Sequence, residues 1–169
     1  PWRPLGRWGG LGSGPGELNN PLKAAVLPDG RLAVTDRGNH RVVLFDAQGK
    51  AVERWERPAL TEPTDIEVSP AGEVYVLDSG RGMVEVFDLQ GKRLRTLGSD
   101  WSIYAPRAMQ FGAKGALYVV ATGSNQVISV PAEGQPVQRF GSQGKGQGEF
   151  QQPVDLAIDS QGNLYVLDT

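Results

Sequence analysis

Asp65 and Asp155 are the carboxylates whose spacing best fits a shared chemical site, because each stands two residues after a proline in a similar stretch of chain. Two carboxylates brought together by the fold would attract a hard cation, which prefers oxygen ligands. The corresponding positions elsewhere hold Lys23 and Ala108, and such a site usually takes more than two ligands. The alternative is that both carboxylates accept hydrogen bonds from nearby backbone N–H groups, or pair with Lys23 or Arg107. We expect no bound metal here.

The histidine and the glycine-rich segments are weaker signals for chemistry. His40 is the only histidine, so a histidine-based metal or catalytic site lacks its usual partners, and we expect a structural role in a turn. The segment 141–146 contains a Gly-Lys pair, but a P-loop needs Ser or Thr after the lysine, where Gly146 stands. Since the chain has no cysteine, thiol catalysis is excluded. We expect no cofactor.

These residues belong to a stretch of sequence that occurs four times, with spacings of 42, 43 and 47 residues. Each copy opens at a proline and has a glycine 9 residues later: Pro21 and Gly30, Pro63 and Gly72, Pro106 and Gly115, Pro153 and Gly162. An apolar triplet closely follows each glycine. A period near 42 built of short strands is typical of β-propeller blades. We expect all four glycines to adopt positive φ in turns.

The first copy divides into four short strands separated by turn residues. We expect strands at 23–27, 31–35, 41–45 and 51–55, with turns such as Pro28-Asp29-Gly30 between them. Nothing in the chain has the apolar spacing of an amphipathic helix. The sequence therefore predicts an all-β fold with essentially no α-helix, namely a β-propeller of four-stranded antiparallel blades.

The predicted blades occupy residues 21–56, 63–98 and 106–141, and residues 153–169 supply the inner two strands of a further blade. Residues 3–9 are expected to form the outer strand of a preceding blade. Because six blades at this period need roughly 250 residues, we interpret the chain as part of a longer propeller. Its open sheet edges would favour self-association.

The loops between blades and the turns between second and third strands lie on one face of a propeller. On that face, the loop 98–106 carries Trp101 and Tyr104 where comparable loops carry glycine. Aromatic residues and arginine are enriched in the hot spots of binding interfaces. The basic residues expected beside them are Arg37, Arg41, Arg81, Arg107 and Lys145. The alternative for Trp101 is that it fills the groove between two blades. The side chains expected at the mouth of the central channel are Lys23, Asp65 and Asp155.

The segment Asp36-Arg-Gly-Asn-His-Arg-Val resembles the NHL repeat family, as do the segments 140–153 and 159–169. The resemblance covers essentially the whole chain, although the third copy departs from it, with Ala121 where the other copies have aspartate. It implies a β-propeller, usually six-bladed, that serves mostly as a binding platform. Enzymes related to the family rely on histidines that His40 alone does not reproduce, so the resemblance implies no catalytic residue here.

Charge and hydropathy exclude some classes of protein. The 17 basic and 19 acidic residues give a net charge of −2, which argues against nucleic-acid binding driven by overall charge. No apolar run is long enough for a transmembrane helix, and no targeting segment is visible. We expect a soluble domain that does not bind membranes, and the compartment stays open.

These observations leave three hypotheses for function. The leading one is a non-catalytic binding or scaffold module that presents its loop face to a protein, a peptide or a glycan. The alternative is a metal-dependent lactonase-like or lyase-like enzyme in the channel, which would depend on Asp65 and Asp155. The second alternative is an RNA-binding propeller, motivated by the arginines and opposed by the net charge of −2.

Overall fold

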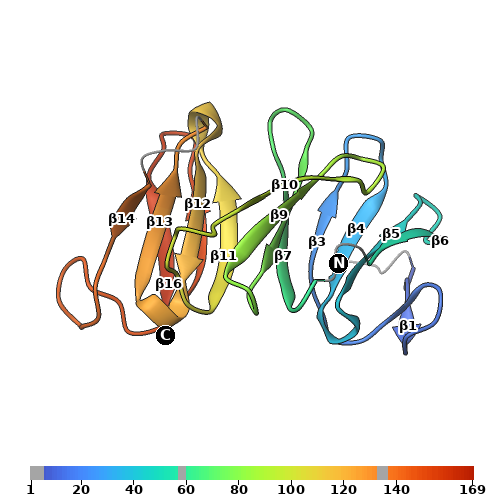
Figure 1. The fold of residues 1–169 in the computed structure, drawn as a ribbon, viewed down its shortest axis with the longest axis horizontal. Helices are drawn as coiled ribbons and strands as arrows, with labels where there is room; N and C mark the ends of the chain where they lie inside the picture. The colour runs from blue at the N-terminus through green and yellow to red at the C-terminus, as the bar shows by residue number, and fades with distance from the viewer. Residues whose placement is uncertain (1–5, 57–59, 133–136) are drawn as a thin grey trace, which may run out of the picture.

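The computed structural model describes residues 6–56, 60–132 and 137–169. Within these residues the strands form three four-stranded sheets and two two-stranded sheets. The sheets stand side by side along the molecule, and a loop leads from each one to the next (Figure 1). This arrangement confirms the predicted all-β fold of repeated propeller blades.

Each four-stranded sheet is an antiparallel meander, because every strand pairs with its neighbour in the sequence. The first sheet contains β3 (Pro21–Val26), β4 (Leu32–Asp36), β5 (Arg41–Phe45) and β6 (Ala51–Trp55). The second contains β7 (Pro63–Val68), β8 (Val74–Asp78), β9 (Met83–Phe87) and β10 (Arg93–Leu97). The third contains β11 (Pro106–Phe111), β12 (Leu117–Ala121), β13 (Gln126–Val130) and β14 (Gln138–Phe140). We call these three sheets blades one to three.

The remaining strands form two smaller pairs. The antiparallel pair β15 (Pro153–Ile158) and β16 (Leu164–Asp168) follows blade three and is called the fourth sheet. The short parallel pair β1 (Gly10–Leu11) and β2 (Glu17–Leu18) precedes blade one.

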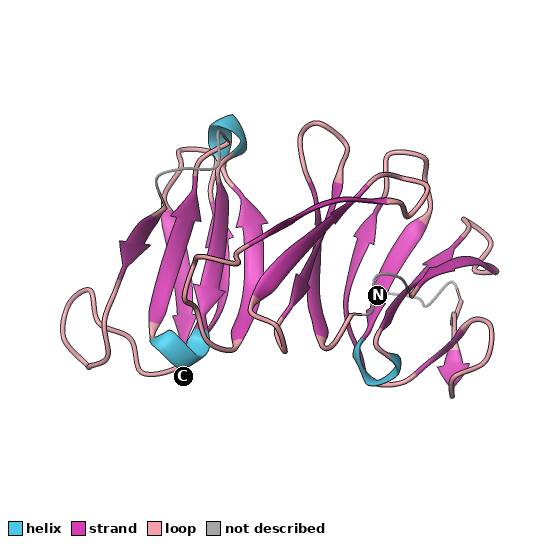
Figure 2. Cartoon of the chain, in the orientation of Figure 1, coloured by secondary structure: helices cyan, strands magenta, loops and turns pink. Residues whose placement is uncertain are grey.

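Helical structure among the described residues is limited to short 3-10 turns (Figure 2). These are η1 (Arg37–Asn39), η2 (Ala113–Gly115) and η3 (Thr122–Ser124). The prediction of essentially no α-helix is confirmed for this part of the chain. None of these turns is long and apolar enough to cross a membrane.

Tight turns end the first strand of each blade and of the fourth sheet, as the glycine spacing predicts. Gly30, Gly72, Gly115 and Gly162 have φ of 86°, 84°, 77° and 86°, which confirms the predicted positive values. Side chains close the turns between the third and fourth strands. In blade one, Asp46 Oδ1 accepts hydrogen bonds from the backbone N–H groups of Gln48 and Lys50 at 3.0 and 2.9 Å. Such local bonds favour a turn over a longer strand.

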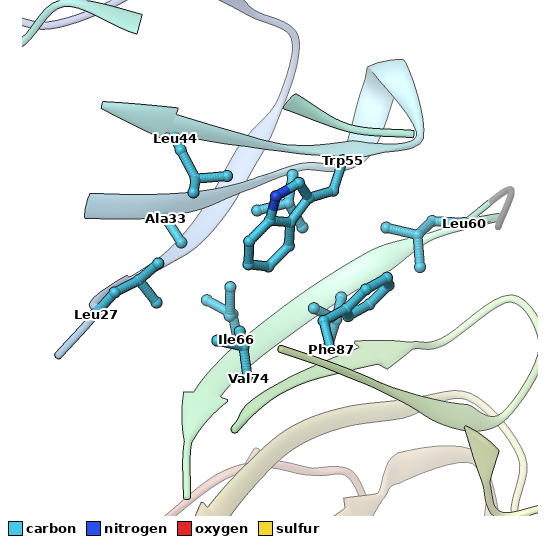
Figure 3. Close-up of a cluster of buried hydrophobic side chains, with 10 residues drawn as sticks. Leu27, Ala33, Leu44, Trp55, Leu60, Ile66, Val74 and Phe87 are labelled. Carbon is cyan, nitrogen blue, oxygen red and sulfur yellow. The ribbon is translucent and has the colours of Figure 1, made fainter. Parts of the chain in front are cut away.

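The hydrophobic core lies between the blades. In the first interface, Trp55 and Leu44 of blade one pack against Ile66, Val74 and Phe87 of blade two (Figure 3). A second buried cluster joins blades two and three, and a third joins blade three to the fourth sheet. Since apolar burial is the main driving force of folding, each blade depends on its neighbours for stability.

The outer strand predicted over residues 3–9 is not formed in its described part, residues 6–9. Residues 3–5 lie outside the described residues, and residues 6–9 are in no strand. Trp8 instead packs on blade one, with its ring centroid 6.3 Å from that of Phe45.

Candidate functional site

Asp65 connects the innermost strands of blades two and three. Its side chain, only 2% exposed, lies on β7. One carboxylate oxygen accepts the N–H of Ile66 at 2.8 Å, and the other accepts the N–H of Met109 on β11 at 2.7 Å. Burial raises the pKa of Asp65 to about 6, although these two hydrogen bonds oppose the shift. Both oxygens are thus engaged by backbone, as the hydrogen-bonding alternative expects.

Asp155 repeats part of this arrangement on β15. Its carboxylate accepts the N–H of the next residue, Leu156, at 2.9 Å. It also lies 3.8 Å from the ammonium group of Lys23 on β3, and both side chains are about half exposed, at 48% and 45%. Lys23 therefore reaches across from blade one toward the fourth sheet. This is the ion pair that the sequence offered as an alternative to a cation site.

Glu67 is a further acidic group that the sequence analysis missed. It stands two residues after Asp65 on β7, so both side chains leave the same side of the strand. Burial raises the pKa of Glu67 to about 7, the nearby charge of Asp65 adds to the shift, and Lys23 opposes it. The alternation of side chains along the strand could have identified this residue. Within the described residues, no group of three or more acidic or histidine side chains is placed to hold a metal ion.

The second region of interest is the loop face, which we define as the side carrying the inter-blade loops and the turns between second and third strands. Arg41 belongs to the interior of this region rather than to its surface. It is 3% exposed and donates to Asp36 at 2.8 Å and to the carbonyls of Ser13, Gly14 and Glu17 at 3.0, 3.1 and 2.8 Å. Arg41 therefore does not lie exposed on the loop face, as its prediction as a binding residue requires, because its donors hold the preceding glycine-rich loop.

Trp101 is also buried, at 3% exposure. It packs in the cluster between blades two and three with Leu77, Val84 and Met109. Arg139 donates a hydrogen bond to its carbonyl oxygen. The packing alternative therefore describes Trp101, and its prediction as an exposed anchor for a partner is wrong. A large apolar ring gains more by filling an inter-blade groove than by facing water.

Tyr104 and Arg81 line the same pocket on the loop face. Tyr104 is 74% exposed, and its backbone N–H donates to Ser124 Oγ at 3.0 Å. Arg81 donates to the buried carboxylate of Glu85 at 2.6 Å. A pocket of about 450 Å³ lies between two inter-blade loops and the turn after β8. Residues that line it are Thr61, Glu62, Arg81, Ile103, Tyr104 and Ala105. We call it the loop pocket.

The other predicted basic residues surround this region less closely. Arg37 pairs with Glu62, a lining residue of the loop pocket, at 3.1 Å. Arg107 and Lys145 are exposed but are not among the lining residues. Three of the five predicted basic side chains, namely Arg37, Arg41 and Arg81, are thus paired with acidic groups. The net positive potential of the face is correspondingly small.

The two glycine-rich loops share one internal design. Glu17 accepts the N–H of Gly14 at 2.8 Å, and Glu149 accepts the N–H of Gly146 at the same distance. A carboxylate already occupies the place where a phosphate would need free N–H groups. In both loops, residues 12–17 and 141–149, this N–H group is thus bonded within the loop, which argues against the P-loop role considered for the segment 141–146.

His40 occupies the left-handed position that ends η1, with φ of 56°. Its Nδ1 is hydrogen-bonded to the carbonyl oxygen of Thr61 in the next inter-blade loop. Asn125 and Gly82 take the same place in blades three and two, with φ of 52° and 63°. The residue therefore serves a turn, as predicted, and ties that turn to the neighbouring blade.

Comparison with known proteins agrees with this geometry. The NHL repeat family model matches residues 18–45, the segment that contains β4 and β5. The RING finger protein nhl-1 of Caenorhabditis elegans is 41% identical over 58 residues, which is 32% of this chain and 6% of that protein.

Solved propeller structures match most of the chain. A streptogramin B lyase structure superposes with a TM-score of 0.74 at 14% identity, covering 89% of this chain and 48% of that one. The WD40 β-propeller domain of Doa1 superposes with a TM-score of 0.73 at 13% identity, covering 90% of this chain and 49% of that one. Kuenenia stuttgartiensis hydrazine synthase superposes with a TM-score of 0.70 at 20% identity, covering 88% of this chain and 42% of that one.

At these identities the structural matches establish the fold alone, and this chain spans about half the length of the propellers that it resembles or less. Three independent observations agree: the meandering four-stranded blades, the match to the repeat, and the superposition on propellers. The chain has the β-propeller fold, and its residues 18–45 match the NHL repeat family model.

Proposed function

We propose that this propeller is a non-catalytic binding module whose loop face holds a protein or peptide partner. The observation that carries the proposal is the loop pocket of about 450 Å³, beside which Tyr104 stands 74% exposed. Binding residues are often found on loops that a rigid scaffold positions. Tyrosine and arginine are enriched at interface hot spots, and Arg81 lines the same pocket.

The paired charges suit a polar peptide better than a polyanion. Glu62 lines the loop pocket and pairs with Arg37, while Glu85 pairs with Arg81. A carboxylate beside each guanidinium repels phosphate, whereas a peptide offers both donors and acceptors. We therefore rank RNA binding below peptide binding, with a glycan as another polar partner of the same pocket.

Catalysis in the channel is the less favoured function. Both carboxylate oxygens of Asp65 accept backbone N–H groups, so this residue is engaged in holding strands. Glu67 has a pKa near 7, which suits general acid–base catalysis. Glu67 would act without a second free carboxylate beside it, since Asp65 accepts two backbone hydrogen bonds and Asp155 pairs with Lys23.

The test is selection of binding peptides from a display library on the purified protein, followed by affinity measurement with variants. We expect Tyr104→Ala and Arg81→Ala each to weaken the selected peptides at least tenfold, about the effect of losing a hot-spot side chain. Gln90→Ala, in an exposed turn on the opposite face, is the matched control and should change nothing. Peptides that bind Tyr104→Ala as well as the wild type would refute the proposed site.

The same set of variants distinguishes RNA binding from peptide binding. Filter binding of single-stranded RNA at two salt concentrations should show no tight, steeply salt-dependent complex, because phosphate contacts weaken strongly with salt. A complex lost in Arg107→Ala or Lys145→Ala but kept in Tyr104→Ala would favour RNA binding instead.

A further inference from the structure

The inter-blade grooves of this propeller can be compared with one another, because corresponding residues line each of them. In the groove between blades one and two, Trp55 of β6 stacks on Phe87 of β9, with ring centroids 5.4 Å apart (Figure 3). Trp55 is 3% exposed and Phe87 is fully buried. An indole therefore fills the outer part of this groove.

The same two positions hold smaller residues in the groove between blades two and three. Leu97 replaces Trp55 at the end of the outer strand, and Val130 replaces Phe87 at the end of the third strand. The aromatic pair of this groove lies on the inner strands instead, where Tyr75 and Phe111 meet edge to face at 4.9 Å. No indole therefore stands at the Trp55 position of this groove. Trp101 packs in the same cluster from the inter-blade loop, but it is not among the residues that line the cavity described next.

A cavity of about 430 Å³ lies in this groove. Its apolar walls include Leu97, Phe111, Leu117 and Val130. Its other walls come from the turns at 69–71 and 131–132, which join first to second and third to fourth strands. The cavity therefore opens on the face opposite to the loop pocket. Its volume lies within the usual range for sites that bind small ligands or side chains.

The charged residues at the edge of the groove also differ between the two grooves. In blade one, Arg31 pairs with Glu53 at 2.7 Å and donates to the carbonyl of Leu89 in the next blade. In blade two the acidic and basic residues have changed places, with Glu73 at the position of Arg31 and Arg95 at the position of Glu53. Arg95 donates to both oxygens of Glu73 at 2.8 and 2.6 Å. A carboxylate at position 73 cannot donate to a carbonyl across the groove, and this tie between the blades is absent at that position.

The exchanged ion pair leaves a structured polar edge on the cavity. Arg95 also donates to the hydroxyl of Tyr75 at 2.8 Å and lies 5.7 Å from the centre of its ring. Glu73, Tyr75 and Arg95 all line the cavity. The carboxylate can accept an N–H from a bound group, while the Tyr75 hydroxyl, which donates to Glu73 at 3.4 Å, helps to hold the ion pair in place.

We propose that this cavity binds an aromatic side chain, tryptophan above all, presented by a peptide partner on the face opposite to the loop pocket. The bound indole would take the place that Trp55 takes in the preceding groove, against Leu97 and Val130. Glu73 would accept the indole N–H or a neighbouring backbone N–H. This second site is independent of the loop pocket, so evidence against one proposed site leaves the other proposal unaffected.

The test uses N-acetyl-tryptophanamide as the probe and follows backbone amide shifts of the protein by heteronuclear NMR. We expect shifts at Glu73, Arg95 and Leu117 on titration of the wild type. Leu97→Trp should weaken the probe at least tenfold, because the protein's own indole then fills the cavity. Val130→Phe is a second way to fill it, and it decides the question if Leu97→Trp does not fold.

Leu94→Trp is the matched control, because it adds an indole to the same strand at an exposed position outside the cavity. It should bind the probe as the wild type does, and so should Tyr104→Ala. No shift of the cavity residues at millimolar probe would overturn the proposal. Unchanged affinity in a folded cavity-filling variant, or shifts confined to the loop pocket, would also overturn it.

Discussion

Asp65 and Met109 are 44 residues apart in the sequence, yet a carboxylate oxygen of Asp65 accepts the backbone N–H of Met109 at 2.7 Å. The bond joins the innermost strands of two successive blades, and the other oxygen of Asp65 accepts the N–H of Ile66 on its own strand. A side chain that could have faced a substrate is therefore part of the inter-blade structure.

Asp65→Ala should lower the free energy of unfolding by about 2–4 kcal/mol, because it leaves two buried N–H groups without an acceptor. Urea denaturation followed by circular dichroism measures the loss. Asp155→Ala is the control, since that side chain is about half exposed and should cost less than about 1 kcal/mol. Equal effects of the two substitutions would contradict the assigned role of Asp65.

Stability should fall as pH rises from about 4 to about 7. The pKa values of Asp65 and Glu67 are raised from 3.8 to about 6 and from 4.5 to about 7. The folded protein therefore binds more protons than the unfolded chain in this window, and the stabilisation is lost as the two groups ionise. Asp29 and Glu73, whose pKa values are lowered, contribute in the opposite sense below their normal values.

Glu67→Gln should reduce this pH dependence. We expect the variant to be more stable than the wild type at pH 8, on the order of 1–3 kcal/mol at about 1.4 kcal/mol per pKa unit, and to differ little at pH 4.5. Melting temperatures at the two pH values test this. A variant with the full pH dependence of the wild type would show that another group is responsible.

Gly91→Ala should destabilise the protein more than Gly30→Ala. Both glycines have positive φ, 74° and 86°, which costs an alanine roughly 1 kcal/mol. At Gly30 the added methyl group meets no atom within 4 Å, whereas at Gly91 it would lie 2.3 Å from Trp55 Nε1. The difference in unfolding free energy between the two variants measures this steric contact, and equal losses would mean that the indole moves away freely.

Arg41→Met should release the glycine-rich loop that precedes blade one. The substitution leaves Asp36 buried without its cationic partner and frees three loop carbonyls. Breaking one side of a buried ion pair costs about 3–5 kcal/mol. Hydrogen exchange should accelerate at Gly12 and Glu17, whose N–H groups bond within the loop. Unchanged exchange there would contradict the anchoring role.

His40→Asn should leave the fold and any binding nearly unchanged. Asparagine already occupies the same left-handed position in blade three, as Asn125 with φ of 52°, and it tolerates this conformation well. The melting temperature should fall by a few degrees at most, because only the bond to the Thr61 carbonyl is lost. A large loss of stability would mean that this contact between neighbouring blades is worth more than a turn position implies.

The sequence by itself determined the blades. Proline and glycine at constant offsets mark the strand starts and turns, and these are local properties that depend on backbone conformation rather than on distant contacts. For the same reason the turn role of His40 and the positive φ of the four glycines could be predicted. The resemblance of Asp36–Val42 to NHL repeats was equally local.

Only the tertiary structure decided which side chains face solvent. Trp101 and Tyr104 are three residues apart in one loop, yet one is 3% and the other 74% exposed, because only Trp101 packs into the cluster between blades two and three. Arg41 is buried by a loop whose path the repeat does not specify. The cavity at Leu97 and Val130 likewise depends on how two blades meet, and a sequence period describes a blade without describing the space between blades.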